Sequence, residues 1–319
     1  MSLERLVDCE GEWPEAASQA ATSPATNHGS NFTDAIATTP GRARVVAGSK
    51  QVLDTSRHPS KPPTQSVMAA FTIAAAQSTS KAGDIEANVA RHLTFLRFAA
   101  KHGVRFLVFP ELSLTGYERE LGRQLAMEPQ DQRLLPLLAE AQRLRVTVVV
   151  GAPLRREGRS DVWIGALTLG ADGEIHAHTK QHLHPGEDLV FSAGSGGPPM
   201  IIDGQSIALA ICADFSHASH AASAADSGVR VYAASALITD NGYPRDTGLL
   251  AGYAAKHKMA VLMANHGGAT GGWEPAGRSA IWAEGGELTV AAPGAGDMLV
   301  TATMGANGWT GAVIAIGDD

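Results

Sequence analysis

Short apolar runs alternate along the chain with segments of helical periodicity, beginning near residue 71. The run Phe71–Gln77 (FTIAAAQ) predicts a buried strand, and apolar positions then recur at helical spacing from Ile85 to Phe98. Asp84 is placed to cap the N-terminus of this helix, and Gly103 to close it. The pattern therefore predicts a β-α unit at the start of a folded region.

The alternation continues toward the C-terminus, but hairpins interrupt it. Further strands are predicted at Val104–Phe109, Val146–Gly151, Val162–Leu169, Glu174–Lys180, Met200–Ile202, Ile207–Ile211, Val231–Ala234, Ala260–Ala264, Arg278–Ala283, Glu287–Ala291, Asp297–Thr303 and Ala312–Ile316. Further helices are predicted at Arg133–Leu144, Ala218–Ala225 and Asp246–Lys258. Hairpin signals lie at Ala171–Gly173, Asp203-Gly204 and Gly285-Gly286. A mixed pair of sheets covered by helices fits this order better than a Rossmann or TIM arrangement.

Residues 1–67 have a different composition from the rest of the chain. They are rich in Ala, Ser, Thr, Pro and Gln, have no sustained period, and contain breakers such as Thr39–Gly41 and Lys61–Pro63. We expect a mostly disordered extension followed by one domain over residues 68–319. Two interpretations of the extension remain open, namely a natural flexible tail, or an upstream or artificial stretch preceding a natural start at Met68.

Composition and charge exclude several classes of partner. The 319 residues are 44% hydrophobic, which is enough for a sizeable core. The net charge is −7, from 25 basic and 32 acidic residues, and no basic cluster favours nucleic acid. No run approaches the roughly 18 apolar residues of a membrane span, and no signal peptide is evident. Because only Cys9 and Cys212 are present, we expect no disulfide framework and a reducing, cytoplasmic setting.

Three polar residues stand where predicted apolar strands end: Glu111, Lys180 and Cys212. Each alone has an ordinary interpretation, as a solvated carboxylate, a surface lysine and a buried apolar-like cysteine. Together they suggest catalysis, because a cysteine nucleophile needs a base and a cation. Cys212 lies between a strand and a helix, so we expect the helix N-terminus to favour its thiolate.

Two histidines offer rival chemistry. His217 and His220 lie three residues apart and suggest, with Cys212, either a Cys-His dyad or a zinc site. A dyad would leave Glu111 and Lys180 without a role, and no His-Glu-x-x-His pattern is present, so we expect no metal. His182 and His184 are interpreted as solvent-facing or loop-bracing.

A glycine-rich segment completes the candidate chemistry. The segment Gly267–Gly272 lacks the Gly-Lys-Ser/Thr ending of a phosphate cradle, and it predicts a flexible loop near the site. We expect no cofactor.

Three sequence blocks resemble the signature blocks of the nitrilase superfamily, the carbon–nitrogen hydrolases, and follow that family's order. They are FPELSLTGY (Phe109–Tyr117), KQHLHPGEDLVFSAG (Lys180–Gly194) and ICADFSHASHAASAADSG (Ile211–Gly228). The resemblance runs from Phe71 to the C-terminus. It implies an α/β protein of mixed sheets, built as a four-layer α-β-β-α sandwich.

The resemblance also implies roles for individual residues. Cys212 would attack the substrate carbon, Glu111 would be the general base, and Lys180 would help hold the oxyanion. The backbone N–H of Ala213 would be a second oxyanion donor, and Glu187 matches a second carboxylate that orients the triad. Four further residues are candidates for the substrate pocket: Tyr117, Phe191, Asp214 and Asn265.

The implied reaction is hydrolysis of a non-peptide C–N bond in a small amide or carbamoyl compound. It passes through a cysteine thioester and releases ammonia or an amine and a carboxylic acid. The segment Cys212–Asp214 (Cys-Ala-Asp) departs from the Cys-Trp-Glu of true nitrilases, which favours an amidase. Nitrile hydrolysis and an inactive binding or scaffold protein remain alternatives, although filled triad positions argue against the latter. The expected partners are a small-molecule amide or nitrile and further copies of the chain, as a homodimer or larger homo-oligomer.

Overall fold

The structure is a computed structural model and describes residues 70–317. The predictions for residues 1–67 and Cys9 lie outside the described residues, so the proposed domain boundary stays a prediction.

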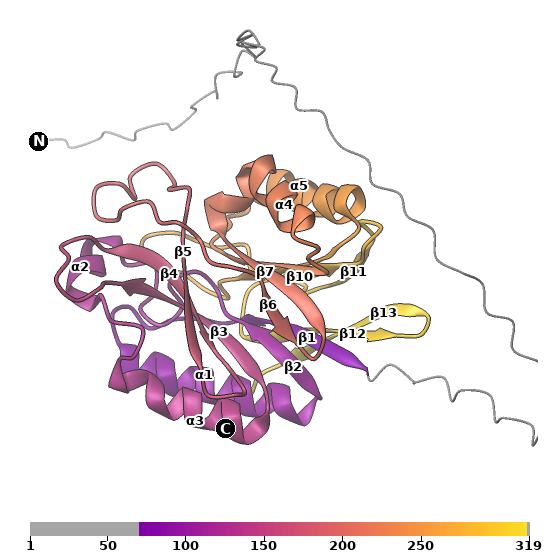
Figure 1. The fold of residues 1–319 in the computed structure, drawn as a ribbon, viewed down its shortest axis with the longest axis horizontal. Helices are drawn as coiled ribbons and strands as arrows, with labels where there is room; N and C mark the ends of the chain where they lie inside the picture. Colours follow the sequence, from indigo (N-terminus) through magenta and orange to yellow (C-terminus); the bar gives the residue numbers. More distant parts are fainter. Residues whose placement is uncertain (1–69, 318–319) are drawn as a thin grey trace, which may run out of the picture. The chain divides into compact units, whose positions relative to one another are not determined.

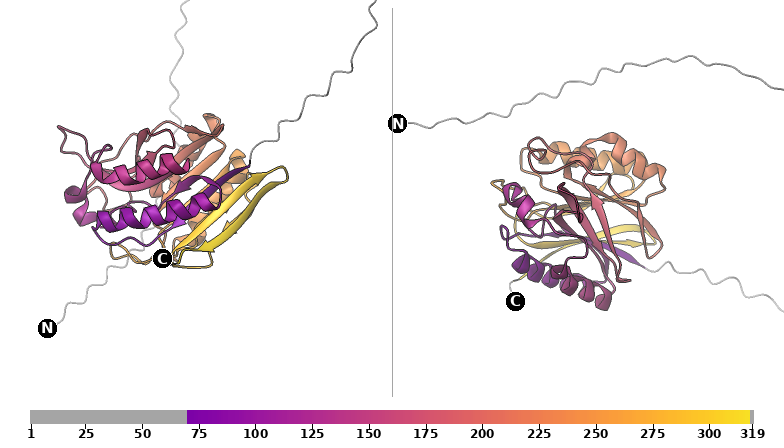
Figure 2. Two further views of the ribbon diagram at one scale, coloured as in Figure 1. Left: turned by 90° about the horizontal axis from the view of Figure 1, so that it is seen from below. Right: turned by 60° about the vertical axis from the view of Figure 1, so that its left-hand side comes forward.

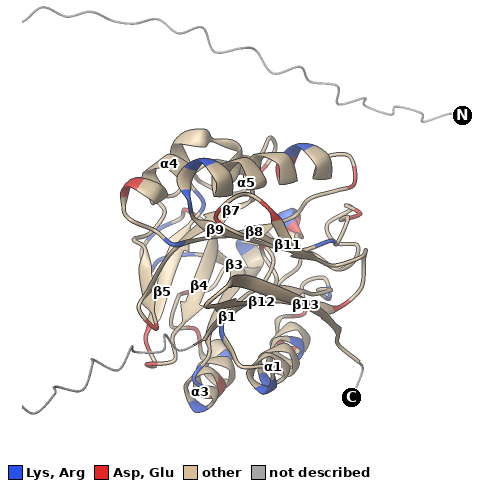
Figure 3. Cartoon of the chain, turned by 90° about the vertical axis from the view of Figure 1, so that its right-hand side faces the viewer, with Lys and Arg blue, Asp and Glu red and all other residues tan. Residues whose placement is uncertain are grey.

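Two β-sheets pack face to face, and each has helices on its outer side (Figure 1; Figure 3). The first sheet has seven strands in the order β13-β12-β1-β2-β3-β4-β5. Its strands are β1 (Phe71–Gln77), β2 (Val104–Val108), β3 (Thr147–Leu154), β4 (Trp163–Leu169), β5 (Ile175–Thr179), β12 (Met298–Gly305) and β13 (Gly308–Ala315). The pairs β1-β2 and β2-β3 are parallel, whereas β12, β13, β4 and β5 join through antiparallel pairs.

The second sheet has six strands in the order β11-β10-β9-β8-β7-β6. Its strands are β6 (Met200–Ile202), β7 (Gln205–Ile211), β8 (Val231–Ala236), β9 (Ala260–Asn265), β10 (Ala280–Trp282) and β11 (Leu288–Ala291). Strands β7, β8 and β9 are parallel, and the hairpin predicted at Asp203-Gly204 joins β6 to β7. Asp203 and Gly204 both have positive φ, the conformation that tight hairpin turns require.

The helices lie in two outer layers. They are α1 (Ile85–Lys101), α2 (Gly122–Leu125), α3 (Leu135–Leu144), α4 (Ala218–Asp226) and α5 (Tyr243–His257), with the 3-10 turns η1 (Arg119–Leu121), η2 (Gln132–Leu134) and η3 (Cys212–Ser216). Figure 2 shows α1 and α3 on one side of the sheet pair and α4 and α5 on the other. Among the described residues, none of these helices combines the length and the apolar character that a bilayer crossing needs.

Three hydrophobic clusters lie between the four layers, and they confirm the predicted α-β-β-α sandwich. Ile73, Phe106 and Leu262 belong to the cluster between the sheets. A second cluster packs the first sheet against α1 and α3, and a third packs the second sheet against α4 and α5. The predicted cap of α1 is also confirmed, because Asp84 Oδ1 accepts a hydrogen bond from Ala87 N at 3.0 Å.

Some element bounds differ from those predicted, for local reasons. Helix α5 begins at Tyr243 rather than Asp246, because Pro244 is compatible with the first turn of a helix. The final strand begins at Gly308 rather than Ala312. Its residues are mostly exposed, so the sequence there lacks the apolar pattern that marks a strand.

The topology brings two strand ends to one edge of the first sheet. Strand β4 runs antiparallel to both β3 and β5, so β3 and β5 share a direction, which is also that of β2. The C-terminal ends of β2 and β5 therefore lie at the same edge. Ser235 of β8 ties the second sheet to this edge, because its hydroxyl donates to Phe109 O at 2.9 Å.

Candidate active site

Glu111, Lys180 and Cys212 follow three strands and converge on one site. Glu111 lies in the turn after β2, Lys180 directly after β5, and Cys212 directly after β7. Lys180 Nζ lies 2.7 Å from Glu111 Oε1. Glu111 and Lys180 also act electrostatically on the Cys212 thiol. The structure thus brings together the three side chains that the sequence singled out, although their roles stay predictions.

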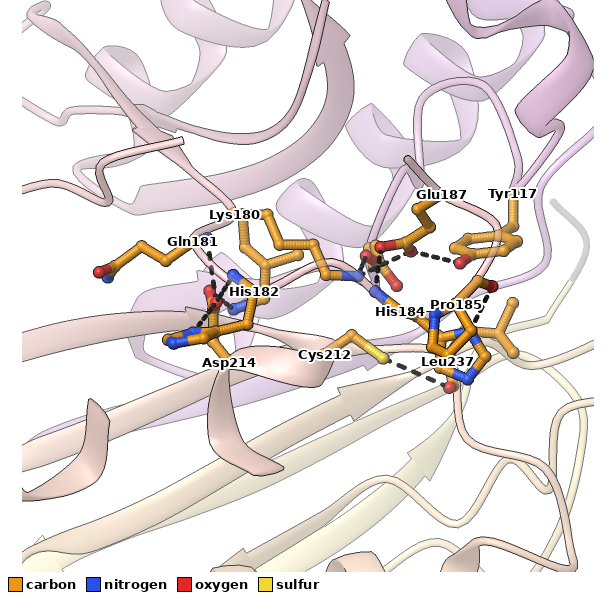
Figure 4. A network of polar contacts seen from close by, with 12 residues as sticks. Tyr117, Lys180, Gln181, His182, His184, Pro185, Glu187, Cys212, Asp214 and Leu237 are labelled. Atoms are coloured by element: carbon orange, nitrogen blue, oxygen red, sulfur yellow. Dashed lines mark hydrogen bonds and ion pairs between the residues drawn. The ribbon is translucent and has the colours of Figure 1, made fainter. Parts of the chain in front are cut away.

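Lys180 bridges two buried carboxylates. Its Nζ donates to Glu111 Oε1 and to Glu187 Oε1, both at 2.7 Å, and all three side chains are fully buried. Figure 4 shows the end of the Lys180 side chain beside Glu187. Burial acts to lower the lysine pKa, but the charges of Glu111, Cys212 and Glu187 outweigh it and raise the pKa. Lys180 is therefore a fixed cation that is shielded from solvent.

Both oxygens of Glu187 are held by donors. Its Oε1 accepts a hydrogen bond from the Tyr117 hydroxyl, and its Oε2 accepts one from His184 N at 2.7 Å. Burial, together with nearby negative charge, raises the pKa of Tyr117, so the phenol stays protonated and keeps donating. These contacts fix the carboxylate that in turn holds Lys180.

Glu111 keeps one oxygen free. Its Oε2 is buried and has no hydrogen-bond partner among the described residues. Burial raises the pKa of Glu111 to about 7, an effect that the charge of Glu187 reinforces and that Lys180 and the nearby Cys212 thiol oppose. A carboxyl group that is near its pKa at neutral pH and has an oxygen without a fixed partner is suited to general acid–base catalysis.

Cys212 is held in a strained backbone conformation. Its φ is 45°, in the left-handed region that side chains other than Gly seldom adopt. Its thiol donates to Leu237 O at 3.6 Å, as Figure 4 shows. A non-glycine residue in this region needs support from its surroundings, and such positions gather at functional sites.

The prediction that a helix N-terminus favours the Cys212 thiolate is wrong. Burial raises the pKa of the thiol well above its usual value, and Glu111 raises it further. Cys212 opens only the short turn η3, and helix α4 begins later, at Ala218. The dipole of one short turn does not offset burial and a neighbouring carboxylate. The resting group is therefore a thiol.

The residues directly after Cys212 connect the two strand ends. Ala213 lies in the first turn of η3, where backbone N–H groups have no partner within the helix. Asp214 is fully buried. Its Oδ1 accepts from Gln181 N at 3.0 Å, and its Oδ2 accepts from Ile211 N at 3.1 Å. One carboxylate thus holds the residue after Lys180 and the residue before Cys212.

The other pocket candidates have structural contacts of their own. Asn265 Oδ1 accepts from Ile238 N at 2.8 Å, and its Nδ2 donates to the carbonyls of Ile238 and Gly277. Phe191 is buried over Gly122, where an added Cβ would lie 2.6 Å from the ring. The contacts of Asn265 hold the backbone at Ile238 and at Gly277 in place. Direct contact of Tyr117, Phe191, Asp214 or Asn265 with substrate stays a prediction.

His266 is a site residue that was not predicted from the sequence. Its Nε2 donates to Glu111 O at 2.7 Å, and burial lowers the histidine pKa to about 4, so the ring stays neutral. It follows Asn265 at the end of β9, the same strand-end signal that marked the other candidates. The loop after it also reaches the site, as predicted, because Tyr117 N donates to Thr270 Oγ1 at 2.8 Å.

The rival histidines make contacts elsewhere. His217 stacks on His182 with ring centroids 3.8 Å apart, and His220 Nδ1 lies 2.8 Å from Tyr232 Oη. The Cys212 thiol instead contacts a backbone carbonyl. These contacts favour the Glu-Lys-Cys arrangement over a Cys-His dyad.

Solved structures with the same fold include an amidase from Nesterenkonia sp. AN1 of the nitrilase superfamily. One mutant of it is 24% identical with a TM-score of 0.66, over 72% of this chain and 90% of that chain. Another mutant, in complex with butyramide, is 23% identical with a TM-score of 0.67. That match covers 74% of this chain and 92% of the amidase chain. These likenesses confirm the nitrilase-type sandwich.

Curated relatives match over shorter stretches. The glutamine-dependent NAD(+) synthetase of Mycobacterium tuberculosis (strain ATCC 25618 / H37Rv) is 37% identical over 89 residues, which is 27% of this chain. The synthetase of Mycobacterium leprae (strain TN) is 29% identical over 136 residues, or 39% of this chain. The matches span only 13% and 20% of those relatives. The family model of the carbon–nitrogen hydrolases matches residues 72–311, and the chain therefore belongs to that family.

Proposed function

We propose that this carbon–nitrogen hydrolase cleaves the C–N bond of a small amide, with Cys212 as nucleophile. The main support for this proposal is the buried Glu111–Lys180–Glu187 network, which interacts electrostatically with the Cys212 thiol. A base near its pKa and a fixed cation beside a thiol are the groups that acyl transfer requires. Water exclusion strengthens each of these interactions.

The first step is attack of the thiol on the amide carbonyl carbon. Glu111 takes the proton from Cys212 as the S–C bond forms, and the carbonyl electron pair moves to oxygen. A base is needed because the raised pKa keeps the thiol protonated. Lys180 Nζ and the N–H of Ala213 stabilise the oxyanion.

The second step expels the amine, and the third releases the acid. Protonated Glu111 gives its proton to the leaving nitrogen as the C–N bond breaks, which leaves a thioester on Cys212. Glu111 then takes a proton from water as the water oxygen attacks the thioester. The C–S bond breaks, the sulfur regains a proton from Glu111, and the carboxylic acid leaves.

Two comparisons support an amide as the substrate class. Solved structures of the Nesterenkonia amidase are described with acrylamide or butyramide bound, or with an acetamide moiety added at the active-site cysteine. The curated relatives are glutamine-dependent enzymes, and glutamine carries a side-chain amide. The test panel therefore contains short aliphatic amides, glutamine and carbamoyl amino acids, together with the corresponding nitriles.

The test compares ammonia release by the wild type, Cys212→Ala and Cys9→Ala. We expect release from at least one amide, its loss in Cys212→Ala, and no change in Cys9→Ala, which removes the chain's other cysteine. Denaturing mass spectrometry of the wild type with substrate is expected to show an acyl adduct on Cys212. If no amide is turned over and Cys212 resists iodoacetamide at neutral pH, the proposal fails. Turnover of nitriles alone would assign the nitrile alternative.

A homo-oligomeric state and a reducing, cytoplasmic setting remain part of the proposal. Cys212 is a free thiol, and a nucleophilic thiol must stay reduced to react. Analytical ultracentrifugation of the full chain is expected to show a dimer or a larger assembly. A monomer at micromolar concentration would contradict that expectation.

A further inference from the structure

Three side chains of metal-binding type meet around Asp214. One potential ligand atom from each of His178, Asp214 and His220 lies within 4.8 Å of those from the other two. They come from β5, η3 and α4, so the fold rather than local sequence brings them together. His178 is 6% exposed and Asp214 fully buried, so two of the three side chains lie away from bulk solvent.

His178 presents a buried ring nitrogen that its surroundings do not satisfy. Its Nε2 has no hydrogen-bond partner among the described residues. A buried polar atom without a partner is unfavourable, and native proteins seldom leave one unexplained. A bound cation would satisfy this nitrogen, so the atom itself points to a ligand.

His220 has the contact expected of a metal-binding histidine. Its Nδ1 lies 2.8 Å from the hydroxyl of the buried Tyr232. With Nδ1–H donating to that hydroxyl, the lone pair is on Nε2, which lies 4.0 Å from Asp214 Oδ2. Metal-bound histidines usually donate their second N–H in this way, which fixes the tautomer and the ring orientation.

The two carboxylate oxygens of Asp214 have different partners. Oδ1 accepts hydrogen bonds from Gln181 N and from His182 N, the latter at 2.8 Å, and it also lies 3.1 Å from His182 Nδ1. Oδ2, the oxygen nearest His220, accepts only from Ile211 N among the described residues. Oδ2 therefore keeps a lone pair on the side of the two histidines.

We propose that His178, His220 and Asp214 bind a divalent transition-metal ion of the zinc type, with water as a further ligand. Two imidazoles and one carboxylate form a donor set that zinc accepts in tetrahedral geometry. Ligand atoms on one zinc ion lie about 3.4 Å apart at bond lengths of about 2.1 Å. The 4.0 Å separation of His220 Nε2 and Asp214 Oδ2, and the upper bound of 4.8 Å within the cluster, therefore require the side chains to move closer when the ion binds.

A cavity of about 280 Å³ gives water and metal access to this site. Its lining includes His178 and His220. The metal would have a structural role, because Asp214 Oδ1 holds the backbone next to Lys180 and its Oδ2 the backbone next to Cys212. The proposal does not depend on Cys212 being a nucleophile.

The test titrates Co²⁺ and Zn²⁺ into full-length protein after chelator treatment, in a Cys212→Ala background so that no thiolate at position 212 binds metal. We expect one equivalent of Co²⁺ with a visible absorption spectrum of nitrogen and oxygen ligands, displaced by Zn²⁺. His178→Ala and His220→Ala should each weaken binding at least tenfold. His176→Ala, on an exposed position of the same strand, is the matched control and should bind like the parent.

A second readout covers variants that fold poorly. Zinc should raise the melting temperature of the parent, because a ligand that binds only the native state stabilises it, and should not raise that of His220→Ala. Tyr232→Phe keeps all three ligands and should weaken binding about tenfold. Any metal that binds elsewhere, for example at His28 or His58, should still bind to the His178→Ala/His220→Ala double variant. The amount bound by the double variant is therefore subtracted from the amount bound by the parent. Equal binding by the parent and the double variant, or no binding by the parent, overturns the proposal.

Discussion

Lys180 Nζ and Glu111 Oε1 lie 2.7 Å apart, and neither side chain is exposed to solvent. Glu111 comes from the turn after β2 and Lys180 from the end of β5, so the pair fixes two strand ends against each other. Glu187 adds a second carboxylate on the same Nζ. Lys180 is therefore the shared cation of two buried carboxyl groups, so removing the lysine should cost more stability than removing one of the two acids.

Lys180→Met should be strongly destabilising, and more so than Glu111→Gln. Removing the lysine leaves Glu111 and Glu187 buried without their cation, which costs about 3–5 kcal/mol. Removing Glu111 leaves Lys180 paired with Glu187, so the loss should be smaller. Urea unfolding of both variants measures the difference. The double variant Lys180→Met/Glu111→Gln should regain part of the loss, and equal destabilisation by both single changes would contradict the bridging role of Lys180.

Activity should fall as the pH drops below about 7. The active form of Glu111 is the carboxylate, and burial raises its pKa to about 7, so protonation removes the base below that pH. The thiol pKa is raised and lies above this range, so Cys212 adds no second ionisation near neutrality. We expect kcat/KM to rise about tenfold per unit of pH below 7 and to level off above it. A profile that is flat from acid to neutral pH would rule out Glu111 as the base.

Tyr117→Phe should reduce turnover while leaving the fold intact. The hydroxyl donates to Glu187 Oε1, which holds Lys180, and a hydrogen bond to a charged group contributes about 1.5–3 kcal/mol. We expect kcat to fall about tenfold, the equivalent of about 1.4 kcal/mol in the barrier. The pH midpoint should also shift, since Glu187 influences Glu111.

Tyr243→Phe is the control for this change. Tyr243 donates to Arg278 O at 2.8 Å from helix α5, so its loss should cost about 1 kcal/mol of stability without changing kcat. If both variants reduce kcat equally, the effect comes from a general loss of stability and not from the positioning of Glu187.

The sheet framework and the three strand-end residues were predictable because their signals are local. Glu111, Lys180 and Cys212 each follow a run of strand-forming residues that is visible in the sequence without knowledge of the fold. The contacts of His266 were not predictable in this way. It meets Glu111 O across 155 positions of sequence, and only the packing of β9 beside the first sheet brings the two together.

The same limit explains the wrong prediction for the Cys212 thiolate. A strand followed by a helix is visible in the sequence, and it favours a lowered thiol pKa. The opposing effects are the desolvation of the thiol in the folded chain and the charge of Glu111, both of which arise from residues distant in sequence. The residue-level pattern thus located the cysteine but not its protonation state.

Gly151→Ala should lower activity by displacing the turn that carries Glu111. Gly151 lies in β3 directly against this turn, and an added Cβ would lie 2.3 Å from Leu112 N and 2.7 Å from Pro110 O. These are backbone atoms on either side of Glu111, so the turn itself must move. A shift of about 1 Å in a catalytic group can cost about a hundredfold in rate, and overpacking costs about 1–3 kcal/mol of stability.

Gly248→Ala is the matched change outside the site. Comparing its activity and stability with those of Gly151→Ala tests whether the close contact at Gly151 positions Glu111. Gly248 lies within helix α5, and an added Cβ there meets no atom within 4 Å. Alanine has the higher helix propensity, so this variant should be more stable by about 0.8–1 kcal/mol and equally active. Steady-state kinetics and urea unfolding of the two variants provide the measurement. Wild-type kcat in Gly151→Ala would contradict the claim that this close contact positions Glu111 for catalysis.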